Sequence, residues 1–450
     1  MTSQFSDQLV AALASGAANS IVEAGKAALA NNADPLSIPD DISDERLTHF
    51  LNGVSSLSPF LGRLMRRSPQ CLERVLSAGS DDGFSCLQPK PLMNETVDDA
   101  KVRLRSVKAD MALAIALADL GGVWQLDEVV SALSNFADKA VEAALAAAWH
   151  NVTSLRGFQP DADGWPSAPT GITLIAMGKM GAGELNYSSD IDLVAFYDPE
   201  ALPVGEESRV DAKAAAVKLV QVTVDILHQQ TEHGYVFRTD LRLRPNPGAT
   251  PVAVSLSAAE VYYEVYGQNW ERAAYIKARP CAGDQNLGAT FMEMIQPFVW
   301  RRTLDFGAVA DIHAIKKQIH AEKGNPDLSA VGGNIKLGPG GIREIEFFAQ
   351  TQQLLLGGRN HALRTPRTLE ALAAFATFEH IETETAEVLA DAYQFLRNLE
   401  HRLQMREDAQ TQTMPTDDDG LRVITALMGY EEQALFLTDV NAHLRFVHDA

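Results

Sequence analysis

Residues 183–198 read GELNYSSDIDLVAFYD and place Asp190 and Asp192 one residue apart at the start of an apolar run. Asp is depleted in strands and like charges repel, so this pair of carboxylates needs a reason. Side chains alternate between the faces of a strand, which predicts that both carboxylates point one way while Ile191 and Leu193 enter the core. Mg²⁺ commonly binds one or two carboxylates together with substrate phosphates, so the pair indicates a metal site.

A third carboxylate, Asp240, stands in YVFRTDLRLR (235–244), which is predicted to form the adjacent strand. The same alternation places Arg238, Arg242 and Arg244 on the face of Asp240, where they could bind phosphate. A DxD pair alone is also compatible with a solvated strand edge. The third Asp among arginines favours a site for one or two Mg²⁺ ions held by all three carboxylates.

A glycine-containing turn precedes the carboxylate pair. ITLIAMG (172–178) is typical of a buried strand, and KMGAGELNYSS (179–189) follows it as the turn. Glycines allow backbone N–H groups to approach a phosphate closely, and serine hydroxyls add donors, although simple turn chemistry would also explain the serines. The phosphate-binding candidates in the turn are Gly178, Lys179, Ser188 and Ser189.

The texture of the sequence predicts three parts. Residues 1–155 are helical in pattern, a Gly/Pro-rich linker spans 157–171, a helix is expected over 206–232, and helices return after about 256. We expect a helical domain, a catalytic domain and a C-terminal helical bundle, with the following boundaries: 1–160, 161–325 and 326–450.

The C-terminal part contains VLADAYQFLRNLEHRLQMRED (388–408), in which an apolar stripe repeats at helical spacing. The stripe consists of Leu389, Tyr393, Leu396, Leu399 and Leu403. Arg402 and Arg406 lie four residues apart in the same helix and are interpreted as surface residues.

The order strand, glycine turn, DxD strand and third-Asp strand resembles the nucleotidyltransferase superfamily, with its polymerase β-like fold. Five longer blocks are similar to the glutamine synthetase adenylyltransferase family: MGKMGAGELNYSSDIDLV, RTDLRLRP, NWERAAYIKARP, GPGGIREIEFFAQTQQLLLGGRN and LEHRLQMREDAQ. They span about 175–410, and Ala176 departs from the glycine usual in the family. The resemblance implies an α+β fold, mostly α, in which a nucleotidyltransferase mixed-sheet domain is flanked by helical domains.

Members of that family carry two nucleotidyltransferase halves. One removes AMP from a tyrosine of glutamine synthetase by phosphorolysis, and the other adds AMP from ATP. WERAAYIKAR and REIEFFAQ resemble the removing half, so the resemblance implies adenylylated glutamine synthetase, phosphate and ADP as partners, two Mg²⁺ ions (or Mn²⁺) as cofactors, and a PII-type signal protein as a regulator. We expect that the chain was cut before a second half.

Two further blocks contribute candidates. Lys277 and Arg279 in NWERAAYIKARP either reach phosphates or form a solvated face. Arg343 and Glu346 lie three residues apart, so they either pair with each other or act near the phosphate and the metals. Trp270 is assigned to the core rather than to base stacking.

Composition limits the alternatives. The chain has 59 Asp+Glu against 38 Lys+Arg, a formal net charge of -21, which argues against nucleic-acid and anionic-membrane partners. The widely spaced Cys71, Cys86 and Cys281 fit no disulfide framework and indicate the cytoplasm. Three functions remain as alternatives to AMP removal: adenylylation of glutamine synthetase with ATP, nucleotidyl transfer to RNA, and a catalytically silent nucleotide-sensing regulatory domain.

Overall fold

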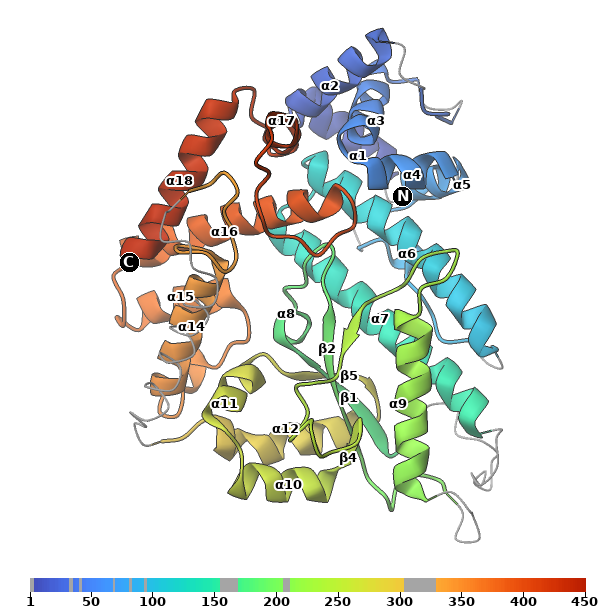
Figure 1. Cartoon of the computed structure of the whole chain (residues 1–450), viewed down its shortest axis with the longest axis vertical. Coiled ribbons are helices and arrows are strands. Elements are labelled where there is room, and N and C mark those ends of the chain that lie inside the picture. The colour runs from blue at the N-terminus through green and yellow to red at the C-terminus, as the bar shows by residue number, and fades with distance from the viewer. Residues whose placement is uncertain are drawn as a thin grey trace.

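The computed structural model describes most of the chain (Figure 1). The described residues are 4–31, 35–39, 43–67, 69–80, 83–92, 95–153, 169–204, 211–302 and 329–450. Most of the linker expected at 157–171 and the first residues of the helix expected at 206–232 lie outside these ranges.

Helices form the N-terminal part of the chain. Asp44 caps one of them by accepting a hydrogen bond from the backbone N–H of Leu47 at 2.8 Å. Helices α2 and α3 pack with their backbones in contact at Gly25. A Cβ added there would lie only 1.8 Å from the carbonyl oxygen of His49, so the contact requires glycine. The helices are α1 (Phe5–Ala14), α2 (Asn19–Ala30), α3 (Glu45–Leu57), α4 (Pro59–Arg67), α5 (Pro69–Ser77), α6 (Val97–Leu120) and α7 (Leu126–Thr153).

A small mixed sheet follows. Its strands run in the order β3-β2-β1-β5, and β4 pairs with β2 as well. Strand β1 is antiparallel to both β2 and β5, whereas β2 is parallel to β3 and β4. The strands are β1 (Ile172–Met177), β2 (Ile191–Tyr197), β3 (Thr239–Asp240), β4 (Ala253–Ser255) and β5 (Arg279–Gly283).

Helices cover both faces of the sheet (Figure 1). Helix α7 and helix α9 (Ala212–His228) pack on one face, while α10 (Leu256–Val265) and α12 (Gln285–Val299) pack on the other. Ile191 and Leu193 are 0% and 1% exposed, so the prediction that they enter the core is confirmed.

The C-terminal part is again helical and lies over the end of the sheet where β2 begins (Figure 1). All five residues of the apolar stripe in α16 are buried, as its spacing predicts. The helices are α14 (Ile342–Leu356), α15 (Thr368–Thr377), α16 (Thr383–Met405), α17 (Asp418–Leu427) and α18 (Gln433–Asp449).

The expected fold class is confirmed: the chain is α+β and mostly α, with a mixed sheet between helical parts. None of the described helices is long and apolar enough to cross a bilayer.

The strand predicted over 235–244 is wrong in extent, because only Thr239–Asp240 pairs with β2. The residues after Asp240 turn away from the sheet. Asp190 precedes β2 rather than opening it. The prediction also missed β4 and β5, which are short and carry no strong alternation.

Arg402 is not a surface residue as expected. It is 8% exposed, and its Nη2 donates to Asp119 Oδ1 of α6 at 2.7 Å. Burial alone would raise the pKa of Asp119, but the charges and hydrogen bonds of Arg402 and His401 together outweigh it, and the pKa falls to about 2. This ion pair joins the C-terminal helix α16 to the N-terminal helix α6.

We expect Asp119→Ala to lower the free energy of unfolding by about 3–5 kcal/mol, because the buried Arg402 loses its partner. Asp127→Ala is a matched control, since Asp127 of α7 also pairs with a C-terminal arginine, Arg367, but is 65% exposed on its side chain. The control should lose at most about 1 kcal/mol. Urea unfolding followed by circular dichroism measures both, and similar small losses would contradict this account.

Candidate active site

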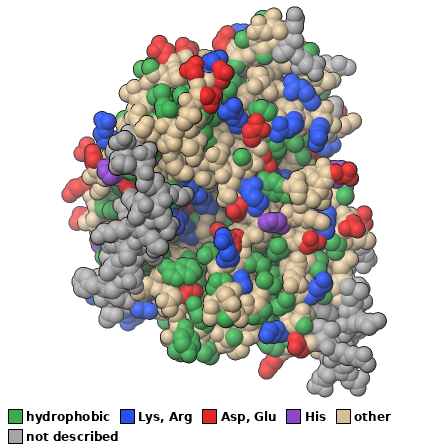
Figure 2. All heavy atoms as spheres, in the orientation of Figure 1, with side chains coloured by type: hydrophobic (Ala, Val, Ile, Leu, Met, Phe, Trp, Pro, Cys, Tyr) green, Lys and Arg blue, Asp and Glu red, His purple; other side chains and the backbone are tan. Residues whose placement is uncertain are grey.

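A cavity of about 640 Å³ lies between the end of the sheet and helices α11 (Asn269–Ile276) and α14. Acidic and basic side chains stand close together near the middle of the face shown in Figure 2, and the cavity brings several of them together. Its lining includes Gly178, Lys179, Ser189, Asp190, Asp192, Asp240, Arg242, Trp270, Lys277, Lys336, Arg343, Glu346, Gln350 and Gln410.

Asp192 and Asp240 are direct partners in the parallel pairing of β2 with β3, so their side chains point to the same side. Asp192 Oδ2 lies against Gly178, where an added Cβ would be only 3.1 Å away and the backbone φ is +58°. Glycine is therefore suited to this position for both space and conformation. The three carboxylates predicted to act together do line one cavity.

The pKa of Asp192 is raised to about 6, first because the carboxyl is buried and then because Asp240 and Asp190 repel its charge. Asp192 forms no hydrogen bond or ion pair that we find with the described residues. Its carboxylate is therefore the least compensated charge of the three.

The other two carboxylates face arginines. Arg238 Nε donates to Asp190 Oδ1 at 2.6 Å, and its Nη2 donates to the carbonyl oxygen of Ser188 at 3.1 Å. Arg242 Nη2 donates to Asp240 Oδ2 at 2.5 Å, and this bond lowers the pKa of Asp240. The side chain of Arg242 is 84% exposed, so it can leave Asp240 with little loss of packing.

Among the described residues, no three Asp, Glu, His or Cys side chains form a group that could hold a metal with their present rotamers. The donor set nevertheless suits Mg²⁺, because it offers hard oxygen ligands, of which the half-buried Asp192 forms no ion pair with the described residues. Asp192 and Asp240 would hold such an ion, with Arg242 turned aside and Asp190 completing the set.

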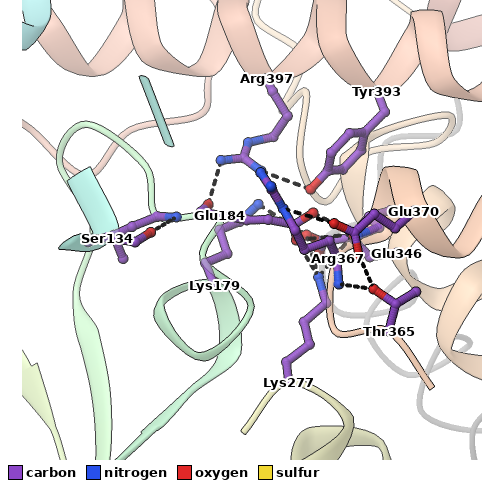
Figure 3. A network of polar contacts seen from close by, with 12 residues as sticks. Ser134, Lys179, Glu184, Lys277, Glu346, Thr365, Arg367, Glu370, Tyr393 and Arg397 are labelled. Carbon is purple, nitrogen blue, oxygen red and sulfur yellow. Dashed lines mark hydrogen bonds and ion pairs between the residues drawn. The ribbon is translucent and has the colours of Figure 1, made fainter. Parts of the chain in front are cut away.

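Several cations chosen from the sequence are already engaged (Figure 3). Lys277 Nζ donates to Glu184 Oε2 at 2.8 Å and to Thr368 Oγ1 at 3.0 Å. Lys179 Nζ donates to Glu346 Oε1 at 3.0 Å. Both lysines border the cavity, but their ammonium groups hold carboxylates rather than face open space.

Burial and neighbouring charges together set the pKa values of the ionisable groups in this network. Burial lowers the pKa of Lys179 to about 8, assisted by the charge of Arg397. Burial alone would raise the pKa of Glu346, but Lys179 and Lys277 outweigh it and hold this pKa well below its ordinary value. The expected pairing of Arg343 with Glu346 is present at 3.5 Å.

Glu184 is the centre of the network and ties the glycine turn to the C-terminal helices. Its Oε1 accepts a hydrogen bond from the backbone N–H of Thr368 at the start of α15 at 2.7 Å. Its own carbonyl oxygen accepts from Arg397 Nη2 of α16 at 2.7 Å (Figure 3). No local pattern singles out Glu184, because its partners lie far along the chain.

Besides Arg238, which holds Asp190, three predicted phosphate-binding residues lie outside the cavity lining. Arg279 Nη1 donates to Asp138 Oδ2 of α7 at 2.7 Å, and Arg244 donates to carbonyl oxygens of its own loop. Ser188 is 3% exposed, and its backbone N–H donates to Gln404 Oε1 at 2.8 Å. None of the three lines the cavity, because each serves packing around it.

Reasoning from the sequence missed several cavity residues, among them Trp270 and Lys336. The core assignment of Trp270 is wrong, since this residue is 38% exposed and lines the cavity. Lys336 reaches the cavity from the loop before α14, and its place just ahead of the glycine-rich LGPGG was the available signal.

Comparison with known proteins gives a consistent result. Residues 48–294 match a family model described as Glutamate-ammonia ligase adenylyltransferase. Residues 313–450 match a second model, described as GlnD PII-uridylyltransferase.

Two relatives carry the name bifunctional glutamine synthetase adenylyltransferase/adenylyl-removing enzyme. The protein from Caulobacter vibrioides is 48% identical over 398 residues, covering 88% of this chain and 40% of that protein. The protein from Rhizobium meliloti is 45% identical over 414 residues, covering 90% of this chain and 42% of that protein. The chain thus spans about two fifths of the length of these curated relatives.

We expect Asp192→Asn to raise the free energy of unfolding of the metal-free protein by about 1–3 kcal/mol at pH 7.5. The folded-state pKa of Asp192 is raised to about 6, so the folded protein binds the proton more tightly and loses stability as the carboxyl ionises. The gain should largely disappear near pH 4, where the carboxyl is protonated in the folded protein. Thermal unfolding at both pH values measures this, with the exposed Asp98→Asn as control.

Added Mg²⁺ should reverse the order of stability at pH 7.5, because wild type gains a ligand that the Asn variant binds poorly. A loss of stability in Asp192→Asn at both pH values without metal would show that this carboxylate supports the fold instead.

Proposed function

Because the chain belongs to the glutamate-ammonia ligase adenylyltransferase family, we propose that it removes AMP from an adenylylated tyrosine of glutamine synthetase by phosphorolysis and releases ADP. The observation that carries this proposal is the cavity in which Asp190, Asp192 and Asp240 meet, where Asp192 forms no ion pair with the described residues and its pKa is raised. The names of the relatives include an adenylyl-removing activity on glutamine synthetase, which supports the choice of substrate.

In this reaction an oxygen of inorganic phosphate attacks the phosphorus of the tyrosine-linked AMP. The bond between phosphorus and the tyrosine oxygen breaks, and that oxygen takes the proton that the hydrogen phosphate gives up and leaves as the free tyrosine hydroxyl. The phosphate and the AMP become ADP, so all atoms are accounted for.

The residues of this chain would mainly position charged groups. When bound, Mg²⁺ (or Mn²⁺) would offset the negative charge on the reacting phosphates. Asp192 and Asp240 would hold the ion or ions, and Arg238 fixes the position of Asp190 through a hydrogen bond of 2.6 Å to its Oδ1. Gly178 leaves room beside Asp192, and Ser189 lines the same cavity.

A second candidate is the addition of AMP to glutamine synthetase from ATP. The description of the matched family model, an adenylyltransferase, favours it. Both reactions place a phosphate chain next to the same carboxylates, so the geometry alone is compatible with either direction. The resemblance of WERAAYIKAR and REIEFFAQ to the removing half favours phosphorolysis.

We also propose the domain boundaries 1–160, 161–325 and 326–450 and a PII-type signal protein as a regulatory partner in the cytoplasm. The match of residues 313–450 to a PII-uridylyltransferase model supports a PII-related role for the C-terminal helices.

We expect the chain to release ADP from adenylylated glutamine synthetase only when Mg²⁺ and phosphate are both present. Chromatography of the released nucleotide measures this, and ATP with unmodified glutamine synthetase is the parallel reaction for the second candidate. AMP released at a rate independent of phosphate would point to hydrolysis and contradict the proposal. Transfer of AMP from ATP without ADP release would favour the second candidate.

Asp240→Asn should lower turnover by at least about a hundredfold, because metal-bound charge is removed from the transition state. Asp98→Asn, an exposed change in α6, should leave turnover unchanged. Full activity in Asp240→Asn would place the reaction elsewhere.

A further inference from the structure

The cations around the cavity differ in how far their donors are used. Lys179 and Lys277 hold buried carboxylates, while Arg238 and Arg242 hold two of the three aspartates. Each of these four cations already uses nitrogen atoms in an ion pair. A phosphate that enters the cavity would have to break that ion pair to bind the same nitrogen atoms.

Lys336 is different. Its side chain is 22% exposed and lines the cavity, and the carboxylate near its Nζ is Glu400 Oε1 at 3.8 Å. That separation is too long for a hydrogen bond, and we find no hydrogen bond from this ammonium group to the described residues. All three N–H donors of Lys336 are therefore left for a ligand.

Glu400 explains why the ammonium group stays in place. Glu400 is fully buried in α16, and neither of its carboxylate oxygens accepts a hydrogen bond among the described residues. Arg397 Nε lies 3.5 Å from Glu400 Oε2, and Lys336 lies on the side of the other oxygen. The buried negative charge attracts Lys336 toward the cavity wall without using up its donors.

The loop before α14 holds Lys336 rigidly. The backbone N–H of Lys336 donates to Asn334 Oδ1 at 3.0 Å, and its carbonyl oxygen accepts from the backbone N–H of Arg343 at 3.0 Å. A Cβ on Gly340 would lie 1.7 Å from the carbonyl oxygen of Leu444, so the loop is packed against α18 without spare room.

Arg343, in the first turn of α14, lines the same cavity. Its side chain is 42% exposed, its Nη1 lies 3.5 Å from Glu346 Oε2, and its guanidinium group stacks 4.5 Å from the centre of the Phe347 ring. The guanidinium group packs on the ring, and it donates no side-chain hydrogen bond to the described residues. Guanidinium groups bind phosphate in pairs of parallel hydrogen bonds.

We propose that Lys336, assisted by Arg343, forms an anion subsite that binds a phosphate group in the cavity that the three aspartates also line. This inference rests on the proposed function and deepens it by naming the residues that receive the phosphate. The ligand is a tetrahedral oxyanion, either free inorganic phosphate or a phosphate group of the nucleotide, and the two sources share the same chemistry. Lys336 is a binding residue here, held in position by Glu400.

The test is calorimetric titration of the folded chain, in the presence of Mg²⁺, with inorganic phosphate and, separately, with ADP. We compare wild type with Lys336→Met, Lys336→Arg and the control Lys26→Met, which removes a half-exposed lysine on α2. Lys336→Met should weaken binding of one of the two anions by at least about tenfold, since a charge-assisted hydrogen bond is lost. Lys336→Arg should keep binding within about threefold, and Lys26→Met should not change it.

The affected anion identifies the source of the phosphate group. Weaker binding of inorganic phosphate alone assigns the subsite to the attacking phosphate, and weaker binding of ADP assigns it to the nucleotide. Unchanged binding of both anions in Lys336→Met overturns the inference.

A merely structural role for Lys336 makes a different prediction, namely that the lysine serves only to neutralise Glu400. The double variant Lys336→Met/Glu400→Gln removes both charges, so it should recover any stability lost in Lys336→Met. We expect its anion binding to stay weak, whereas recovered binding in the double variant would overturn the inference. Because calorimetry needs no turnover, anion binding that depends on Lys336 in a chain unable to remove AMP would contradict only the proposed function.

Discussion

The buried contact between Lys277 and Glu184 joins the parts of this molecule that form the site. Glu184 lies in the turn after β1, Lys277 lies between α11 and β5, and Thr368 and Arg397 bring in the two C-terminal helices α15 and α16. Taking charged groups out of water is costly, so such a network stabilises the fold only when each charge is paired and hydrogen-bonded. The network determines where the C-terminal helices contact the end of the sheet. The cavity lies between the end of the sheet and helices α11 and α14.

The site itself has the opposite character, since its charges are balanced incompletely. Asp192 has the raised pKa expected of a buried carboxyl beside two others, and Lys336 carries donors that no described side chain uses. A protein gains nothing in stability from either arrangement. Both become favourable when a cation enters on the aspartate side and an oxyanion enters on the lysine side, and a metal–phosphate pair supplies both charges.

Short-range pattern was enough to predict the first two strands, the turn between them and the meeting of the three aspartates. β1 and β2 are buried runs of β-branched and apolar residues, and alternation across neighbouring strands aligns Asp192 with Asp240. Alternation failed after Asp240, where the chain leaves the sheet and Arg244 binds its own loop. The partners of Lys277 and Arg279 are 93 and 141 residues away, and no local pattern predicts such contacts. Lys336 was missed for the same reason, because only the packing of its loop turns it toward the aspartates.

We propose that Asp192 and its neighbours bind a divalent cation and that Arg242 withdraws from Asp240 when the cation enters. Crystals of the chain grown with Mn²⁺ and ADP allow the ion to be located directly by its anomalous scattering. We predict an anomalous peak within about 2.0–2.3 Å of carboxylate oxygens of Asp192 and Asp240, with Arg242 turned away from Asp240 and the peak lost in Asp192→Asn. A map without a peak at these carboxylates, in which Arg242 still holds Asp240 while ADP occupies the cavity, would contradict the account.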